Sequence, residues 1–149
     1  MTGHLVFTTV HANNVTDVIG RFINMGVEPY NFVSALNCIM AQRLVRVICP
    51  HCKQPNGRVM SPEGESVLTW RGAGCLECNG RGYASRMGIF EMMDVNDEMR
   101  KLIMNNADAS VLTRTARQNG MRNLREDGWR KIEDGVTTVE EVMRVTQEF

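Results

Sequence analysis

The chain has 149 residues, of which 43% are apolar and 23% are charged, and this composition is typical of a folded globular protein. Lys plus Arg number 17 and Asp plus Glu also number 17, so the formal net charge is zero. A neutral chain is not expected to bind nucleic acid or an anionic membrane over its whole surface. No apolar run approaches the roughly 18 residues of a membrane-spanning helix.

The charges are nevertheless spread unevenly along the chain. Residues 43–86 carry seven basic and three acidic side chains, a sum of +4, whereas residues 91–149 carry nine basic and twelve acidic ones, a sum of −3. The basic middle segment has two interpretations. It is either an ordinary solvated surface or a patch that meets an acidic partner or a phosphate.

The first predicted element is a strand at residues 5–10. This segment, LVFTTV, is short, β-branched and aromatic, a pattern typical of a strand buried on both faces of a parallel sheet. No second such strand follows in the next 30 residues. We therefore expect its neighbouring strands to come from a larger protein.

Two helices are predicted to follow. Asn13 or Asn14 can cap a helix that runs to about Met25. Proline is favoured in the first turn of a helix, so the next helix is expected to begin at Pro29 and to run to about Arg43.

The middle of the chain is predicted to form two strands with an irregular segment between them. A short strand is expected at residues 44–48 and another at residues 87–92. Between them, residues 53–74 are polar and contain Gly and Pro, which indicates a loop with at most a turn of helix near residues 61–63.

The remaining residues predict a bundle of helices. The first is capped by Asn96, the second spans residues 110–119, and the third spans residues 122–133 with a break or strain near Gly128. Thr138, with Glu141 three residues later, forms a capping-box pattern at the start of the last helix.

Cysteine spacing gives the strongest chemical signal. Four cysteines form two C-x-x-C pairs separated by 22 residues, namely Cys49, Cys52, Cys75 and Cys78. Two such turns place four thiolates around one tetrahedral ion, and a closed set of four ligands is typical of structural Zn²⁺. Free thiols, disulfides, an iron–sulfur cluster, a chaperone-type zinc repeat and a ligand role for His51 are the alternatives. The fifth cysteine, Cys38, is interpreted as a small buried residue on the second helix.

Two histidines flank the first predicted strand. His4 and His11 could serve a nucleotide site at the edge of a sheet, or they could simply hydrogen-bond to the backbone at the ends of the strand. The chain contains no G-x-x-x-x-G-K-[ST] motif and therefore no loop of the kind that cradles phosphates. These residues alone are not expected to form a working ATPase.

Several segments together resemble one family. TGHLVFTTVHAN resembles the histidine box of the ATPases that drive type II secretion and type IV pilus assembly. IMAQRLVRVICPHCK and GCLECNGRGYASRMGIFEMM resemble the two halves of the tetracysteine motif of that family. GMRNLREDGWRKIEDGVTTVEEVMRVT resembles its C-terminal helices, so the similarity covers nearly the whole chain in order.

The resemblance implies a fold class and a domain division. The expected class is α+β and mostly α-helical, in a C-terminal portion of the family's hexameric motor. Residues 1–48 would end a RecA-like motor core, residues 49–86 would form a tetracysteine zinc module, and residues 87–149 would form a C-terminal helical subdomain. The Walker motifs that bind ATP and Mg²⁺ would lie upstream.

The resemblance also implies roles and partners. His4, His11 and Arg21 would act near the nucleotide site in the full-length motor only. The motor would assemble with itself as a hexamer and act on an inner-membrane platform protein. It would be cytoplasmic, held peripherally at the inner membrane through its partners, with no nucleic acid expected as a partner.

Two other functions are compatible with the pattern. A free-standing zinc-ribbon adaptor that binds protein would also lack Walker motifs. A zinc ribbon that binds nucleic acid would account for the basic middle segment, but Tyr83 and Trp70 are the only aromatic residues there that could stack on bases.

Overall fold

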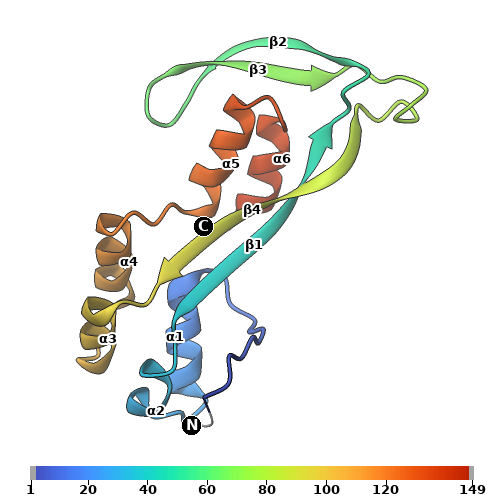
Figure 1. The fold of residues 1–149 in the computed structure, drawn as a ribbon. Helices are drawn as coiled ribbons and strands as arrows, with labels where there is room; N and C mark the ends of the chain where they lie inside the picture. The colour runs from blue at the N-terminus through green and yellow to red at the C-terminus, as the bar shows by residue number, and fades with distance from the viewer. Residues whose placement is uncertain (1–2, 148–149) are drawn as a thin grey trace. The chain divides into compact units, whose positions relative to one another are not determined.

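The structure, a computed structural model, describes residues 3–147. Its helices and strands establish an α+β class, in agreement with the sequence prediction (Figure 1). In chain order the elements are α1 (Val15–Asn24), α2 (Pro29–Val33), β1 (Cys38–Ile48), β2 (Lys53–Met60), β3 (Ser66–Gly72), β4 (Tyr83–Asp94), α3 (Asp97–Met104), α4 (Ala109–Gln118), α5 (Leu124–Glu133) and α6 (Val139–Thr146). Within the described part of the chain, no helix is both long and apolar enough to cross a membrane.

The chain divides into two compact units. One contains the chain up to Ile39 together with Met93–Asn119, and the other contains Met40–Met92 together with the chain from Gly120 on. The helices of residues 87–149 are thus shared between the two units. The three-part division into residues 1–48, 49–86 and 87–149 stays a prediction.

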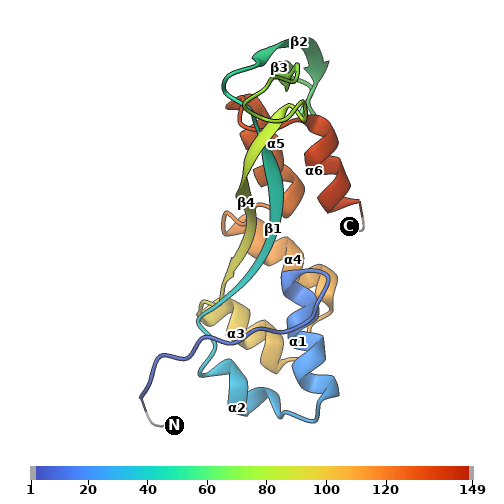
Figure 2. The same cartoon turned by 90° about the vertical axis from the view of Figure 1, so that its right-hand side faces the viewer.

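The first unit is built from four helices, among which α2 packs on α3, α3 on α4, and α1 on α4 (Figure 2). The predicted cap of α1 is confirmed at Asn14, whose side-chain oxygen accepts the N–H of Asp17 at 3.0 Å. Asn96 caps α3 in the same way, and Met99 and Ile103 on that helix are fully buried, as their helical spacing predicts.

The predicted strand at residues 5–10 is not formed. Residues 4–12 have no regular secondary structure, and the side chains of Leu5, Val6 and Phe7 are 74–88% exposed. A strand needs the backbone groups of a neighbour to complete its hydrogen bonds. The described residues contain no neighbour paired with this segment.

The second predicted helix is also wrong in its extent. α2 ends at Val33, and the residues that were expected to continue it form the long strand β1. Pairing with β4 overrides the helical spacing of the apolar residues, because β1 buries alternate side chains such as Ile39 and exposes Met40. Cys38, predicted to be buried, is exposed at the start of this strand.

The predicted loop at residues 53–74 is instead a hairpin. β2 and β3 pair antiparallel, from Lys53 opposite Gly72 to Met60 opposite Ser66. The hydroxyl of Thr69 donates to two backbone carbonyls of the irregular part of β2, at 3.0 and 3.1 Å. The hairpin lies over α5 and α6, and β3 packs directly against α5 (Figures 1 and 2).

The core of the second unit joins residues from distant parts of the sequence. Its buried members are Val45, Val67, Ile89, Leu124, Trp129, Ile132 and Val142. Each of the strands β1, β3 and β4 contributes one side chain, and the others come from α5 and α6. The core therefore ties both helices to the strands that carry the cysteine pairs.

Gly128 does not break α5, contrary to the sequence prediction. The helix is continuous from Leu124 to Glu133, and Gly128 is buried where α5 meets α6. A Cβ atom at this position would lie 2.5 Å from Cγ1 of Val142. The absence of a side chain therefore permits the close approach of the two helices.

Substitution of this glycine tests the contact. We expect Gly128→Ala to lower the free energy of unfolding by about 1–3 kcal/mol, because the added methyl group overlaps Val142. Gly20→Ala is the matched control: Gly20 also lies inside a helix, but its Cβ would meet nothing within 4 Å. That change should raise the free energy of unfolding by about 0.5–1 kcal/mol. Denaturant titrations measure both, and a neutral or stabilising Gly128→Ala would contradict the packing argument.

Candidate metal centre

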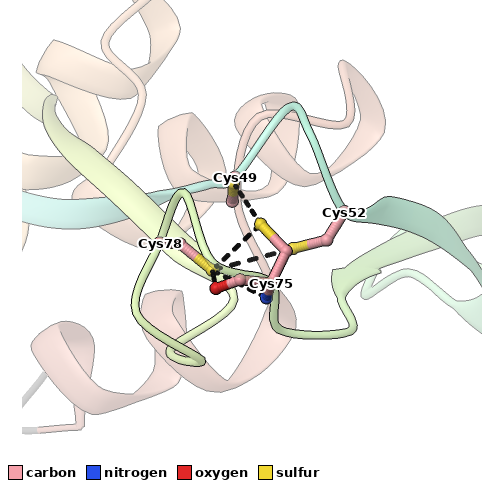
Figure 3. A group of neighbouring side chains, drawn as sticks. All are labelled: Cys49, Cys52, Cys75 and Cys78. Carbon is pink, nitrogen blue, oxygen red and sulfur yellow. Dashed lines mark hydrogen bonds between the residues drawn. The ribbon is translucent and has the colours of Figure 1, made fainter.

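The structure brings together the side chains of all four paired cysteines. The sulfur atoms of Cys49, Cys52, Cys75 and Cys78 lie within 4.8 Å of one another, and the side chains converge from two separate turns (Figure 3). The shortest sulfur–sulfur distances are 3.7 Å between Cys75 and Cys78, and 3.8 Å for Cys49 with Cys75 and for Cys52 with Cys78. Four sulfurs at 2.3 Å around a tetrahedral zinc ion would be about 3.8 Å apart, so the arrangement fits that ion.

Each cysteine pair lies in a turn that the backbone holds in place. The first pair follows β1 directly, and the second lies in the segment between β3 and β4. The two turns are joined by the Cys49 N–H, which donates to the carbonyl of Gly82 at 2.9 Å, and by the Ala73 N–H, which donates to the carbonyl of Cys52 at 3.0 Å. The positions of the four sulfurs are therefore set by main-chain hydrogen bonds between the two turns.

Backbone amides also point at the sulfurs. Gly74 donates its N–H to Cys52 Sγ at 3.3 Å, while Cys75 and Gly82 donate theirs to Cys78 Sγ at 3.3 and 3.2 Å. Burial raises the pKa of the Cys78 thiol, but the N–H groups of Cys75 and Gly82 and the neighbouring thiols outweigh it and lower the pKa to about 6. Burial and the neighbouring thiols raise the pKa of the Cys52 thiol to about 11, so the site favours one thiolate, at Cys78, the form that binds metal.

Glycines next to the ligands are required by the geometry. Gly80 and Gly82 have φ values of 74° and 78°, in the left-handed region that other residues rarely adopt. A Cβ at Gly72 would overlap the carbonyl oxygen of Gly82, so the ends of β3 and β4 meet backbone against backbone.

A network of charge-assisted hydrogen bonds that no local sequence pattern predicts lies on the segment before the first cysteine pair. The buried carboxylate of Glu141 accepts from the backbone N–H of Arg46 at 2.8 Å and from its guanidinium at 2.7 and 2.9 Å, as well as from Arg144 at 2.8 and 3.1 Å. The capping-box pattern found the contact of Thr138, which accepts the Glu141 N–H at 3.2 Å. It could not find the contact with Arg46, which is 95 residues away.

The charge of Glu141 is maintained by these donors. Burial raises the pKa of its carboxyl, but the hydrogen bonds from Arg144 and Arg46 outweigh that effect and lower the pKa from 4.5 to about 2. Because the folded-state pKa lies below the unfolded one, the ionised carboxylate stabilises the fold above about pH 4.5. That contribution is lost as the pH falls toward 2.

The residues predicted to serve a nucleotide site lie elsewhere. His4 and His11 are exposed within the irregular segment that precedes α1, and Arg21 is exposed on the last turn of α1. Arg21 borders a hollow of about 520 Å³ between α1 and the start of α4. The catalytic roles of these three residues remain predictions.

Comparison with known proteins identifies related chains. The family model described as "Type II/IV secretion system protein" matches residues 1–144. The Type II secretion system protein E of Pseudomonas aeruginosa is 44% identical over 99% of this chain and 31% of its own length. The Type IV pilus assembly ATPase PilB of Myxococcus xanthus is 40% identical over 96% of this chain and 27% of its own length. The chain thus spans about a third of such relatives.

A solved structure has a similar fold. The X-ray structure of the ATPase DotB from Yersinia pseudotuberculosis matches 99% of this chain and 32% of its own, with a TM-score of 0.61 and 21% identity. At this identity the likeness concerns the fold alone.

Metal analysis tests the cysteine site directly. We expect one Zn²⁺ per chain in protein purified without chelators, and loss of that ion in the variant with Cys75→Ser and Cys78→Ser, because two thiolates cannot complete a tetrahedral site. Circular dichroism should still report helix from the first unit in that variant. Wild-type protein without zinc, or with four thiols that react freely with a thiol reagent in the folded state, would contradict the assignment.

Proposed function

Because the chain belongs to the type II/IV secretion system protein family, we propose that it forms part of an ATP-driven motor of type II secretion or type IV pilus assembly. The observation that carries this proposal is the match of nearly the whole chain to secretion and pilus ATPases at 36–44% identity. A free-standing adaptor would not be expected to share that collinear similarity.

The proposal assigns nucleotide chemistry to the longer protein. The 149 residues contain no G-x-x-x-x-G-K-[ST] motif, so ATP and Mg²⁺ would be held by other parts of the motor. This chain would be the C-terminal portion, contributing the end of a RecA-like core with His4, His11 and Arg21 near the nucleotide. We further propose that the motor is a cytoplasmic hexamer, held at the inner membrane by its platform protein.

The four cysteines are proposed to bind structural Zn²⁺. The support is the set of sulfur–sulfur distances near 3.8 Å and the amide donors on Cys52 and Cys78. The ion would cross-link the end of β1 to the segment before β4. Because a site with four protein ligands has no open position, the ion would not take part in phosphoryl transfer.

Histidine substitutions test the proposed nucleotide roles. In the full-length motor, we expect His4→Ala or His11→Ala to lower ATP turnover by roughly 10–1000-fold, the range for loss of one polar contact in a transition state. The 149-residue chain alone should show no turnover above background. Steady-state phosphate release measures both. Unchanged turnover in the two histidine variants, or hydrolysis by the isolated chain that is lost on His11→Ala, would contradict the proposal.

We expect the metal centre to matter more for transmitting motion from the motor to its platform protein than for binding nucleotide. We expect Cys75→Ser with Cys78→Ser in the full-length motor to abolish secretion or pilus assembly while ATP affinity is retained. The reason is that the centre orders the basic segment of residues 43–86, which suits contact with an acidic surface of the platform protein.

Two measurements distinguish the outcomes: equilibrium binding of a fluorescent ATP analogue, and pilus or secretion output in cells. Parallel loss of ATP binding and output would mean general unfolding and would refute the transmission role. Retained output in a variant that lacks zinc would refute it as well.

A further inference from the structure

The strand that leads into the first cysteine pair is fixed by the start of α6. The backbone N–H of Arg46 donates to Glu141 Oε2 at 2.8 Å, and the hydroxyl of Thr137 donates to the carbonyl of Arg46 at 2.7 Å. The N–H of Ile48 donates to the carbonyl of Val136 at 2.9 Å. The residues directly before Cys49 are therefore hydrogen bonded to the segment 136–141.

β4, the strand that follows the second cysteine pair, also contacts the start of α6. Tyr83 directly follows Gly82, whose N–H donates to Cys78 Sγ and whose carbonyl accepts from Cys49. The phenol oxygen of Tyr83 lies 2.7 Å from Oγ1 of Thr138, the N-cap of α6. The end of β1 and the start of β4, which flank the two cysteine pairs, thus both contact the segment 136–141.

The two contacts are joined to each other. The guanidinium of Arg46 lies over the ring of Tyr83, 4.2 Å from its centroid, while the same guanidinium donates to Glu141. Glu141 is 1% exposed, and its oxygens accept five hydrogen bonds from Arg46 and Arg144. Charge-assisted hydrogen bonds to a buried carboxylate are strong and directional, so this group restricts where the strands lie.

We propose that Thr138, the N-cap of α6, and Glu141, in its first turn, are positioning residues for the metal centre, so that metal binding and the order of this first turn are coupled. By thermodynamic reciprocity, an ordered first turn raises metal affinity by the same factor by which bound metal favours its order. The inference rests on the proposed binding of Zn²⁺ by the four cysteines.

Metal affinity of matched variants tests the coupling. Zinc competition with a chromophoric chelator should show affinity reduced about 10–100-fold in Glu141→Gln, the usual effect of losing an outer-shell partner. The control is Arg125→Met, because Arg125 holds the other end of α6 through the carbonyl and hydroxyl of Thr146, at 2.7 and 3.2 Å. That variant should bind zinc as the wild type does. The visible absorption bands of bound Co²⁺ should shift in Glu141→Gln only, since they report the geometry of the sulfur ligands.

Hydrogen exchange on the wild-type chain gives a second test that needs no substitution. We expect added Zn²⁺ to slow amide exchange in α6 and to leave exchange in α1 and α3 unchanged, since those helices belong to the other compact unit. If Glu141→Gln fails to fold, hydrogen exchange on the wild-type chain still tests whether metal binding orders α6. Tyr83→Phe, which removes only the contact with Thr138, then replaces Glu141→Gln in the zinc-affinity measurement.

The outcomes separate the two proposals. If the wild-type chain binds no zinc, the proposed metal centre itself is refuted. If wild type binds zinc but Glu141→Gln has the same affinity and Co²⁺ spectrum, the positioning role is refuted. Zinc binding without slower amide exchange in α6 refutes the coupling. If Arg125→Met loses as much zinc affinity as Glu141→Gln, the loss reflects general destabilisation of the fold, and the positioning role is refuted.

Discussion

Four sulfur atoms within 4.8 Å of one another impose the main constraint on the second unit. Thiolates at this separation repel, so the arrangement requires protons or a shared cation, and a zinc ion satisfies it with four bonds. To bring the sulfurs together, the end of β1 must meet the segment before β4, and the two are joined where the Cys49 N–H donates to the carbonyl of Gly82. Gly72 and Gly82 allow the end of β3 to approach the same segment, and the Gly82 amide points at the sulfur of Cys78.

The constraint extends to the C-terminal helices through a buried charge. Burying a carboxylate that is only 1% exposed would destabilise the fold if it had no partners. Glu141 forms ion pairs with Arg46 and Arg144. Removing either arginine would leave the buried carboxylate of Glu141 with fewer donors, whereas the guanidinium groups of Arg46 and Arg144 are about half exposed. Since Arg46 lies three residues before Cys49, the polar network and the cysteine site share one short segment of β1. The hydrophobic core adds Val45 on the opposite side of the same strand, packed with Trp129 and Val142.

This arrangement gives the second unit a fixed local geometry. The family to which the chain belongs includes ATPases of secretion and pilus assembly, and the chain spans about a third of those proteins. A metal ion with four cysteine ligands would resist local deformation, and so does a buried ionic network, because the bonds in both are directional. The apolar segment of Leu5, Val6 and Phe7 lacks such bonds. Its side chains are exposed, and within the described part of the chain no strand pairs with it.

Local sequence chemistry by itself determined the caps of α1 and α3, the start of α6, the order of the helices and the identity of the four clustered cysteines. Each depends on residues a few positions apart, such as Asn14 with Asp17, or Cys75 with Cys78. Only the tertiary structure decided that residues 38–48 form a strand, that residues 53–72 form a hairpin, and that Gly128 packs rather than breaks its helix. The contact of Glu141 with Arg46 joins residues 95 apart, and Gly72 meets Gly82 across two elements. Such contacts arise from which surfaces pack together, and packing between distant segments leaves no periodic or spaced pattern in the chain.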